Sequence, residues 1–188
     1  MRTKAELRTA ILMARREVPQ RQHAVEAQAL AYHLSAVIDD AASVCAYVPV
    51  GSEPGSIELI DSLHRRGVRV LLPVARSDVE GLQWGGYRPG ELVAAPFGLR
   101  EPAPPWLGAD AIADASVILV PGLAVDRRGV RLGRGAGFYD RALPLADPGA
   151  RRIAVVRDDE LVDALPAEPH DVRMTHALTP SRGLVALG

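Results

Sequence analysis

The chain has 188 residues, enough for one domain with a substantial buried core. Hydrophobic residues make up 48% of it and aromatic residues only 4%, so the core must consist mainly of aliphatic side chains. The formal net charge of −1 gives no overall reason to expect nucleic acid or an anionic membrane as a partner, so any anion must be bound by a local group of basic side chains.

Apolar stretches in the chain are short. None approaches the roughly 18 residues that a membrane-spanning helix needs, and Glu6, Arg8 and Arg15 interrupt the N-terminal apolar residues before a signal-peptide core can form. The only cysteine, Cys45, lies in the apolar run of residues 43–48 and is expected to be buried, because free cysteine packs as a small hydrophobe. We therefore expect a cytoplasmic protein that binds neither membranes nor nucleic acid.

The N-terminal part of the chain has the periodicity of two helices. Thr3 and Glu6 form the pattern of a capping box at the start of the first helix, which ends before Pro19. A second helix is expected from Gln20 to about Val37. The residues expected on the inner faces are Leu7, Ile11, Ala14 and Val18 in the first helix, and Val25, Leu30, Leu34 and Val37 in the second.

Strand and helix patterns alternate from residue 43 onward. Buried strands are predicted at residues 43–48, 68–72, 116–120 and 153–156, and helices at residues 56–66 and 137–143. An edge segment is expected at residues 82–87, a proline-rich loop at 98–105, and short extended pieces at 174–179 and 184–187. The pattern predicts a single α/β domain over residues 1–188, with a mostly parallel sheet flanked by helices.

Ligands of such sheets bind in a cleft at the carboxyl ends of the strands. Two loops are therefore candidates for the site, residues 49–55 and residues 121–138. In the second loop Gly133, Gly135 and Gly137 alternate, so the backbone can approach a ligand closely and direct N–H groups at it.

The second loop is also basic and precedes a predicted helix, whose N-terminal end favours anions. Five arginines lie in or just after it: Arg127, Arg128, Arg131, Arg134 and Arg141. These features indicate a polyphosphate-binding loop, whereas the glycine pattern alone would fit a solvated basic loop equally well. The loop lacks the Gly-Lys-Ser/Thr of a P-loop and the glycine spacing of the dinucleotide fingerprint.

Residues 121–140 read P-G-L-A-x-D-x-x-G-x-R-L-G-x-G-x-G-x-Y-D, which strongly resembles the signature of the 5-formyltetrahydrofolate cyclo-ligase family. Three further segments agree with that family in order and spacing, so the resemblance spans nearly the whole chain. They are Lys4-x-x-Leu7-Arg8, then Glu53-Pro54-Gly55-Ser56 followed by Leu63, Gly67 and Leu72-Pro73, and Gly98-Leu99-Arg100-Glu101-Pro102.

The resemblance implies a nucleotide site made by the N-terminal helix and the glycine-rich loop. The implied ATP-binding residues are Lys4, Arg8, Arg131, Leu132, Gly133, Arg134, Gly135, Ala136, Gly137, Phe138 and Tyr139. At ~100° per residue, Lys4, Arg8 and Arg15 project within about 40° of one another, as a stripe of cations would. A solvated basic helix face is the alternative explanation for that stripe.

The resemblance also implies a folate site and a magnesium site. The implied folate-binding residues are Val50, Glu53, Gly55, Arg134, Gly135, Ala136, Gly137 and Phe138. Glu53 would accept hydrogen bonds from the pterin, or would instead only stabilise the N-terminus of the following helix. Asp140 and Asp171 are the implied Mg²⁺ ligands, since Mg²⁺ prefers carboxylate oxygens and phosphates.

The implied reaction converts 5-formyltetrahydrofolate and ATP into 5,10-methenyltetrahydrofolate, ADP and phosphate, with Arg134 as the catalytic residue and a monomer or weak homodimer as the assembly. Phe138 and Ala136 depart from the family, where tyrosine and glycine or lysine are common. Two alternatives remain: a sugar-phosphate isomerase or CoA-transferase-like enzyme, and a non-catalytic regulator that binds folate or nucleotide. Lys4 is the only lysine, which disfavours a lysine-based mechanism.

Overall fold

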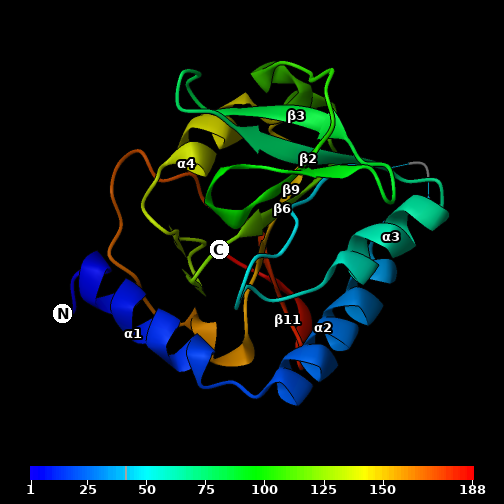
Figure 1. The fold of residues 1–188 in the computed structure, drawn as a ribbon. Helices are drawn as coiled ribbons and strands as arrows, with labels where there is room; N and C mark the ends of the chain where they lie inside the picture. Colours follow the sequence, from blue (N-terminus) through cyan, green and yellow to red (C-terminus); the bar gives the residue numbers. More distant parts are fainter. Residues whose placement is uncertain (41) are drawn as a thin grey trace.

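A computed structural model describes residues 1–40 and 42–188. Its central sheet contains β1 (Ser43–Cys45), β2 (Arg69–Ala75), β3 (Leu82–Gly86), β6 (Val117–Pro121), β9 (Arg151–Val155), β11 (His176–Thr179) and β12 (Gly183–Ala186). The strand order is β12-β11-β9-β6-β1-β2-β3. The strands from β11 to β2 run parallel, and β3 and β12 are antiparallel edges (Figure 1). The prediction of an α/β fold with a mostly parallel sheet is confirmed.

The central strands are apolar at nearly every position because helices cover both faces of the sheet. In β6, Val117 and Leu119 pack into the core on one face, and Ile118 and Val120 pack into the core on the other. Cys45 on β1 is fully buried, as predicted.

The first face is covered by α2 (Gln20–Ser35) and α3 (Ile57–Arg65), and the second by α4 (Phe138–Ala142) and the short 3₁₀ turns η2 (Ala109–Asp114) and η3 (Leu143–Leu145) (Figure 1). The predicted inner face of α2 is partly wrong, because Val25 is 59% exposed. Ala27, Leu30 and Leu34 are the buried positions. Val25 and Leu30 are five residues apart, which rotates them ~140° from each other at ~100° per residue.

The N-terminal helix α1 (Lys4–Arg16) begins with the predicted capping box, in which Thr3 Oγ1 accepts from the Glu6 N–H at 3.2 Å and the Thr3 N–H donates to Glu6 Oε2 at 2.7 Å. Leu7 and Ile11 on α1 pack against a third, smaller core rather than against the main sheet. This core lies on a small sheet of β7 (Ala124–Asp126), β8 (Arg131–Leu132) and β10 (Leu161–Val162), in the order β10-β7-β8. No helix of the described residues is long and apolar enough to cross a membrane.

Some local predictions are wrong, mainly where short strands pair within segments predicted to be loops. The predicted strand at residues 43–48 ends at Cys45. The predicted loop at residues 98–105 contains β5 (Arg100–Pro102), which pairs with β4 (Leu92–Ala94) across the turn η1 (Pro96–Gly98). The predicted loop at residues 121–138 contains β7 and β8. Proline and glycine in these segments suggest loops, and only the pairing partners make them strands. The remaining short turn is η4 (Asp158–Glu160).

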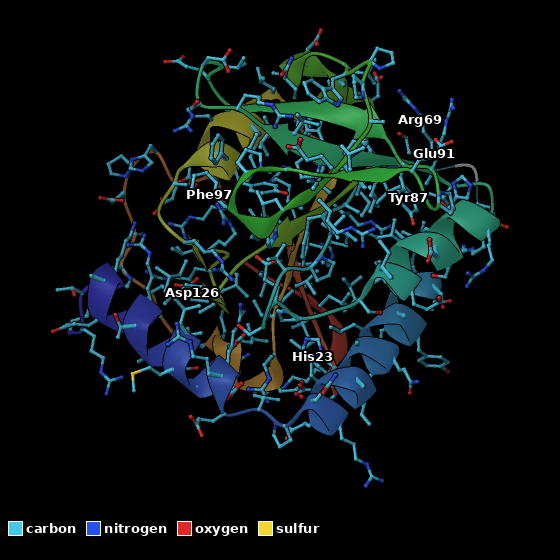
Figure 2. All side chains as sticks on the ribbon, in the orientation of Figure 1. His23, Arg69, Tyr87, Glu91, Phe97 and Asp126 are labelled. Atoms are coloured by element: carbon cyan, nitrogen blue, oxygen red, sulfur yellow. The ribbon has the colours of Figure 1, made fainter. Side chains whose placement is uncertain are left out.

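A buried carboxylate, Asp126, holds this second loop in shape (Figure 2). Its Oδ1 accepts from the backbone N–H groups of Arg128 at 2.9 Å and Val130 at 2.9 Å. Its Oδ2 accepts from the Leu165 N–H at 3.0 Å and from Arg128 Nη2 at 3.0 Å. The side chain therefore fixes the turn between β7 and β8 and ties it to the C-terminal segment.

We expect Asp126→Asn to lower the free energy of unfolding by about 2–4 kcal/mol, because an amide cannot accept all of these hydrogen bonds and leaves buried donors unsatisfied. Asp163→Asn is the matched control: Asp163 also pairs with an arginine, Arg127, at 3.3 Å, but is 96% exposed. That control should change stability by less than about 0.5 kcal/mol. Urea denaturation of the three proteins measures both differences, and equal stability of the two variants would contradict this role of Asp126.

The same comparison has an expected pH dependence. Burial raises the pKa of Asp126, but the hydrogen bonds from Leu165, Val130 and Arg128 outweigh it, so the pKa lies below its ordinary value. A lowered pKa contributes stability that is present above the unfolded-state value and is lost as the pH falls through the folded-state value. The stability difference between wild type and Asp126→Asn should therefore shrink in acid.

Candidate functional site

The order in which the chain adds strands to the sheet reverses between the neighbouring strands β1 and β6. From β1 the chain runs to β2 and β3 on one side, and from β6 to β9, β11 and β12 on the other. Such a switch point leaves a crevice beyond the carboxyl ends of the two adjacent strands. A cavity of about 520 Å³ lies there, within the range of small-molecule sites. The predicted cleft is thus present, and both predicted loops border it.

The cavity collects nearly all of the predicted site residues from distant parts of the chain. Those that line it are Lys4, Arg8, Val50, Glu53, Arg131, Leu132, Gly133, Arg134, Gly135, Ala136, Gly137, Phe138, Tyr139, Asp140 and Asp171. Gly55 is not part of this lining. It has a φ of +99°, and a side chain there would contact Pro49 at 3.5 Å. Its position suits a role in shaping the turn before α3 rather than direct contact with a ligand.

The glycine-rich loop has the backbone that its sequence suggests at two of its three glycines. Gly135 has a φ of +105° and Gly137 a φ of +78°, which side-chain-bearing residues rarely adopt. A Cβ at Gly135 would lie 3.5 Å from the Arg8 guanidinium carbon. Arg8 Nε also donates to the Gly133 carbonyl at 2.8 Å. The loop and α1 are therefore in direct contact, although more than a hundred residues separate them.

The arginines of this loop are mostly paired with carboxylates, so the predicted basic cradle is less positive than its sequence suggests. Arg131 is largely buried, and its Nη2 lies 3.2 Å from Asp140 Oδ1. Arg127 and Arg128 do not line the cavity, and they pair with Asp163 and Asp126 respectively.

The remaining two arginines, Arg134 and Arg141, line the cavity. Arg134 Nε lies 3.5 Å from Glu53 Oε1, across the crevice between the two loops. The Arg141 guanidinium lies 5.1 Å from the centre of the Phe138 ring, within range of a cation–π contact.

The predicted stripe of three cations on α1 is only partly available to a ligand. Lys4 Nζ lies 2.6 Å from Glu168 Oε2 and 3.6 Å from Asp171 Oδ2 at the cavity edge. Arg15, in contrast, is 3% exposed and is held by Glu160, with Nε–Oε1 at 2.8 Å and Nη2–Oε2 at 2.9 Å. Arg15 Nη2 also donates to the Gly122 carbonyl at 2.7 Å. The contacts of Arg15 with Glu160 and Gly122 attach α1 to the rest of the domain.

Glu53 turns its side chain into the cavity instead of toward α3. Its Oε2 accepts from the Val50 N–H at 2.8 Å, which closes a tight turn after β1. Burial raises the pKa of Glu53, while the Val50 hydrogen bond and the Arg134 charge oppose that shift. The carboxylate is thus largely desolvated and lies opposite the glycine-rich loop.

The carboxylates predicted to hold a metal lie along one side of the cavity. Asp171 belongs to a group with Glu168 and His170 whose ligand atoms lie within 4.8 Å of one another. Burial lowers the pKa of Arg131, and the negative charges of Asp140 and Asp171 both oppose that shift. Their hard oxygen atoms fit the ligand preference of Mg²⁺. Glu168 was not predicted from the sequence, since a glutamate in a proline-rich turn resembles any surface residue.

Sequence reasoning also missed a second wall of the cavity, formed by Tyr47, Leu99, Arg100 and Glu101 among others. Glu101 is buried and accepts a two-pronged contact from Arg76, at 2.6 and 2.7 Å. The resemblance of residues 98–102 to the family was a signal here, but it carried no site assignment.

The Tyr139 hydroxyl is buried within the cavity wall and lacks a hydrogen-bond partner among the described residues. Burial raises its pKa, so the hydroxyl remains protonated and can donate. An unpaired buried hydroxyl is costly, so a bound ligand that accepts from it would be favoured.

Comparison with known proteins identifies the family. The model of the 5-formyltetrahydrofolate cyclo-ligase family matches residues 1–180. The chain is 65% identical over 190 residues to a 5-formyltetrahydrofolate cyclo-ligase of Mycolicibacterium smegmatis, which covers 99% of this chain and 98% of that protein. It is 32% identical over 143 residues to the Escherichia coli protein of the same name, covering 74% and 79% of the two chains.

Solved structures agree in fold. The 5,10-methenyltetrahydrofolate synthetase of Aquifex aeolicus superposes with a TM-score of 0.81 at 22% identity, covering 97% of this chain and 92% of that one. The synthetase of Mycoplasma pneumoniae gives a TM-score of 0.73 at 20% identity, with 92% and 96% covered. Taken with the family match over nearly the whole chain, these findings show that this protein is a ligase and belongs to the 5-formyltetrahydrofolate cyclo-ligase family.

Proposed function

We propose that the protein converts 5-formyltetrahydrofolate into 5,10-methenyltetrahydrofolate, with ATP as phosphoryl donor and ADP and phosphate as products. The observation that carries the proposal is the position of Glu53 opposite the glycine-rich loop, with Arg134 Nε 3.5 Å from Glu53 Oε1 in one cavity. A carboxylate suited to a pterin and a loop suited to phosphates thus share one space, as a reaction between two substrates requires.

The nucleotide side of the proposal rests on α1 and the loop. The backbone of residues 133–137 lines the cavity, and its positive-φ glycines allow phosphate oxygens to come close to N–H groups. Lys4 and Arg8 reach the same space from α1. Because Lys4 is already held by Glu168 and Asp171, a bound phosphate would have to share it or exchange for these carboxylates.

The folate side rests on the turn after β1. Val50 and Glu53 line the cavity there, and the Glu53 carboxylate can accept hydrogen bonds from pterin N–H groups. Charge–dipole contacts in a desolvated site are stronger than at the surface. When folate engages Glu53, Arg134 would lose its present partner and become free to contact the transferring phosphate.

Asp140 and Asp171 would hold Mg²⁺, with Glu168 as a further carboxylate nearby. Bound there, the ion would neutralise charge on the phosphate oxygens. The largely buried Arg131 next to Asp140 keeps that carboxylate oriented toward the cavity.

The chemistry needs no protein nucleophile. The formyl oxygen attacks the γ-phosphorus, the bond from that phosphorus to the ADP oxygen breaks, and an activated iminium phosphate forms. N10 of the folate then attacks the formyl carbon. The bond from that carbon to the phosphorylated oxygen breaks to release phosphate, and N10 loses its proton. The protein aligns the two substrates and stabilises the charge that moves onto phosphate. Arg134 is the residue proposed to stabilise this charge.

An absorbance assay for the methenyl product, with ATP and 5-formyltetrahydrofolate supplied together and separately, tests this function. Product is expected only when both are present. Binding of both ligands without product would instead support a non-catalytic regulator, and activity on a sugar phosphate would support an isomerase.

We expect Arg134→Lys to lower turnover at least about tenfold, or roughly 1.4 kcal/mol, since lysine cannot offer a two-pronged contact to phosphoryl oxygens. ATP affinity should fall less. Arg127→Lys is the matched control, because Arg127 lies in the same loop and pairs with Asp163, an exposed carboxylate outside the cavity lining. Steady-state kinetics and direct ATP binding separate the two effects, and equal losses in both would reduce Arg134 to a nucleotide-binding residue.

We expect Asp140→Asn to bind folate nearly normally and to lose most magnesium-dependent turnover, because an amide oxygen is a weaker Mg²⁺ ligand than a carboxylate. Asp163→Asn serves again as control, since its ion pair with Arg127, at 3.3 Å, resembles the 3.2 Å pair of Asp140 with Arg131. Titration of activity with Mg²⁺ gives the comparison. A wild-type rate with unchanged Mg²⁺ dependence would remove Asp140 from the metal site.

We expect Lys4→Ala and Arg8→Ala to weaken nucleotide binding without unfolding the protein, because both side chains face the cavity rather than the core. Arg16→Ala, an exposed arginine on the same helix, should leave both properties unchanged. Nucleotide titration measures the affinity of each variant, and circular dichroism checks that each variant is folded. Wild-type affinity in both variants would make α1 a purely structural helix.

A further inference from the structure

A histidine outside the cavity holds the turn that carries Glu53. His23 lies on α2 (Figure 2). Its Nε2 lies 3.0 Å from the backbone carbonyl oxygen of Glu53. A carbonyl oxygen can only accept, so the histidine nitrogen donates, in either its neutral Nε2–H form or its protonated form. His23 does not line the cavity, so it can reach a ligand only through Glu53.

The turn held by His23 is small and tightly closed. The Glu53 N–H donates to the Val50 carbonyl at 3.1 Å, and the Val50 N–H donates to Glu53 Oε2 at 2.8 Å. The position of the Glu53 carboxylate is therefore coupled to the position of its own backbone. A contact that fixes the Glu53 carbonyl from behind also fixes where the carboxylate lies in front.

His23 is placed for this contact by the inner face of α2. It lies seven residues before the buried Leu30, which puts the two side chains within ~20° on the helix. The side chain is half-buried between α2 and the turn after β1. Helix α2 is anchored in the main core, so it provides a rigid support for a turn that has no regular secondary structure of its own.

A second histidine of the same helix makes an equivalent contact elsewhere. His33 Nε2 lies 3.0 Å from the Pro180 carbonyl oxygen, and its side chain is also half-buried. Pro180 belongs to the turn between β11 and β12 and does not line the cavity. The two histidines share helix, donor atom, acceptor type and bond length, and differ in whether the acceptor belongs to the site.

We propose that His23 is a positioning residue for folate binding, which acts by holding the Glu53 turn from behind. This inference rests on the proposed role of Glu53 in binding the pterin. It assigns His23 no contact with substrate and no proton transfer.

We expect His23→Ala to raise KM for 5-formyltetrahydrofolate about three- to tenfold, the range for the loss of one ordinary hydrogen bond, and to leave kcat and KM for ATP within about twofold. His23→Gln should recover most of the loss, because a glutamine amide can donate from nearly the same place. His33→Ala should leave KM for folate unchanged. An equal effect of the two alanine variants, or no recovery by glutamine, would overturn the inference.

Amide hydrogen exchange in the ligand-free protein tests the same inference without any substrate. The N–H groups of Val50 and Glu53 should exchange faster in His23→Ala and at the wild-type rate in His33→Ala. Unchanged exchange in His23→Ala would refute the positioning role even in an active enzyme. A wild type that forms no methenyl product would instead refute the proposed function, while the exchange result would still decide the role of His23 in the turn.

Discussion

The parallel pairing of β1 with β6 is the constraint on which the rest of the structure depends. Both strands are apolar on both faces, so each is fixed in the middle of the sheet by burial rather than by its loops. Because they are parallel and adjacent, the segments that follow them leave the sheet at the same edge. The turn with Glu53 and the glycine-rich loop therefore face each other across a crevice that neither segment could form alone.

Much of the charge at this crevice is paired before any ligand binds. The arginines that the sequence concentrates near the loop are distributed among carboxylates, with Arg131 on Asp140 and Arg134 on Glu53. A carboxylate partner offsets part of the cost of removing a cation from water. Under the proposed function, binding of an anionic nucleotide and of folate would exchange partners within this network, and the contact between Arg134 and Glu53 would link the two ligand sites.

Helix α1 belongs to the site although it lies at the opposite end of the sequence. Three kinds of contact attach it: the small core around Leu7 and Ile11, the buried ion pair of Arg15 with Glu160, and the hydrogen bond from Arg8 to Gly133. The first two fix the helix and the third joins it to the glycine-rich loop. The sequence spacing put Lys4, Arg8 and Arg15 on one stripe, and all three line the cavity. Only the packing shows that the Arg15 guanidinium is buried and paired with Glu160.

The sequence by itself determined the parallel α/β sheet, the capping box, the glycine-rich loop and the family, because these depend on local periodicity, caps and a long continuous motif. It could not determine the short strands β5, β7 and β8, whose residues favour loops until a partner strand supplies hydrogen bonds. Only the tertiary structure brought Glu53 opposite Arg134, removed Gly55, Arg127 and Arg128 from the cavity lining, and placed His23 behind the Glu53 turn. The contacts of Glu53 with Arg134 and with His23 join residues far apart in the chain. Such contacts follow from the packing of helices on a sheet, which no local sequence pattern records.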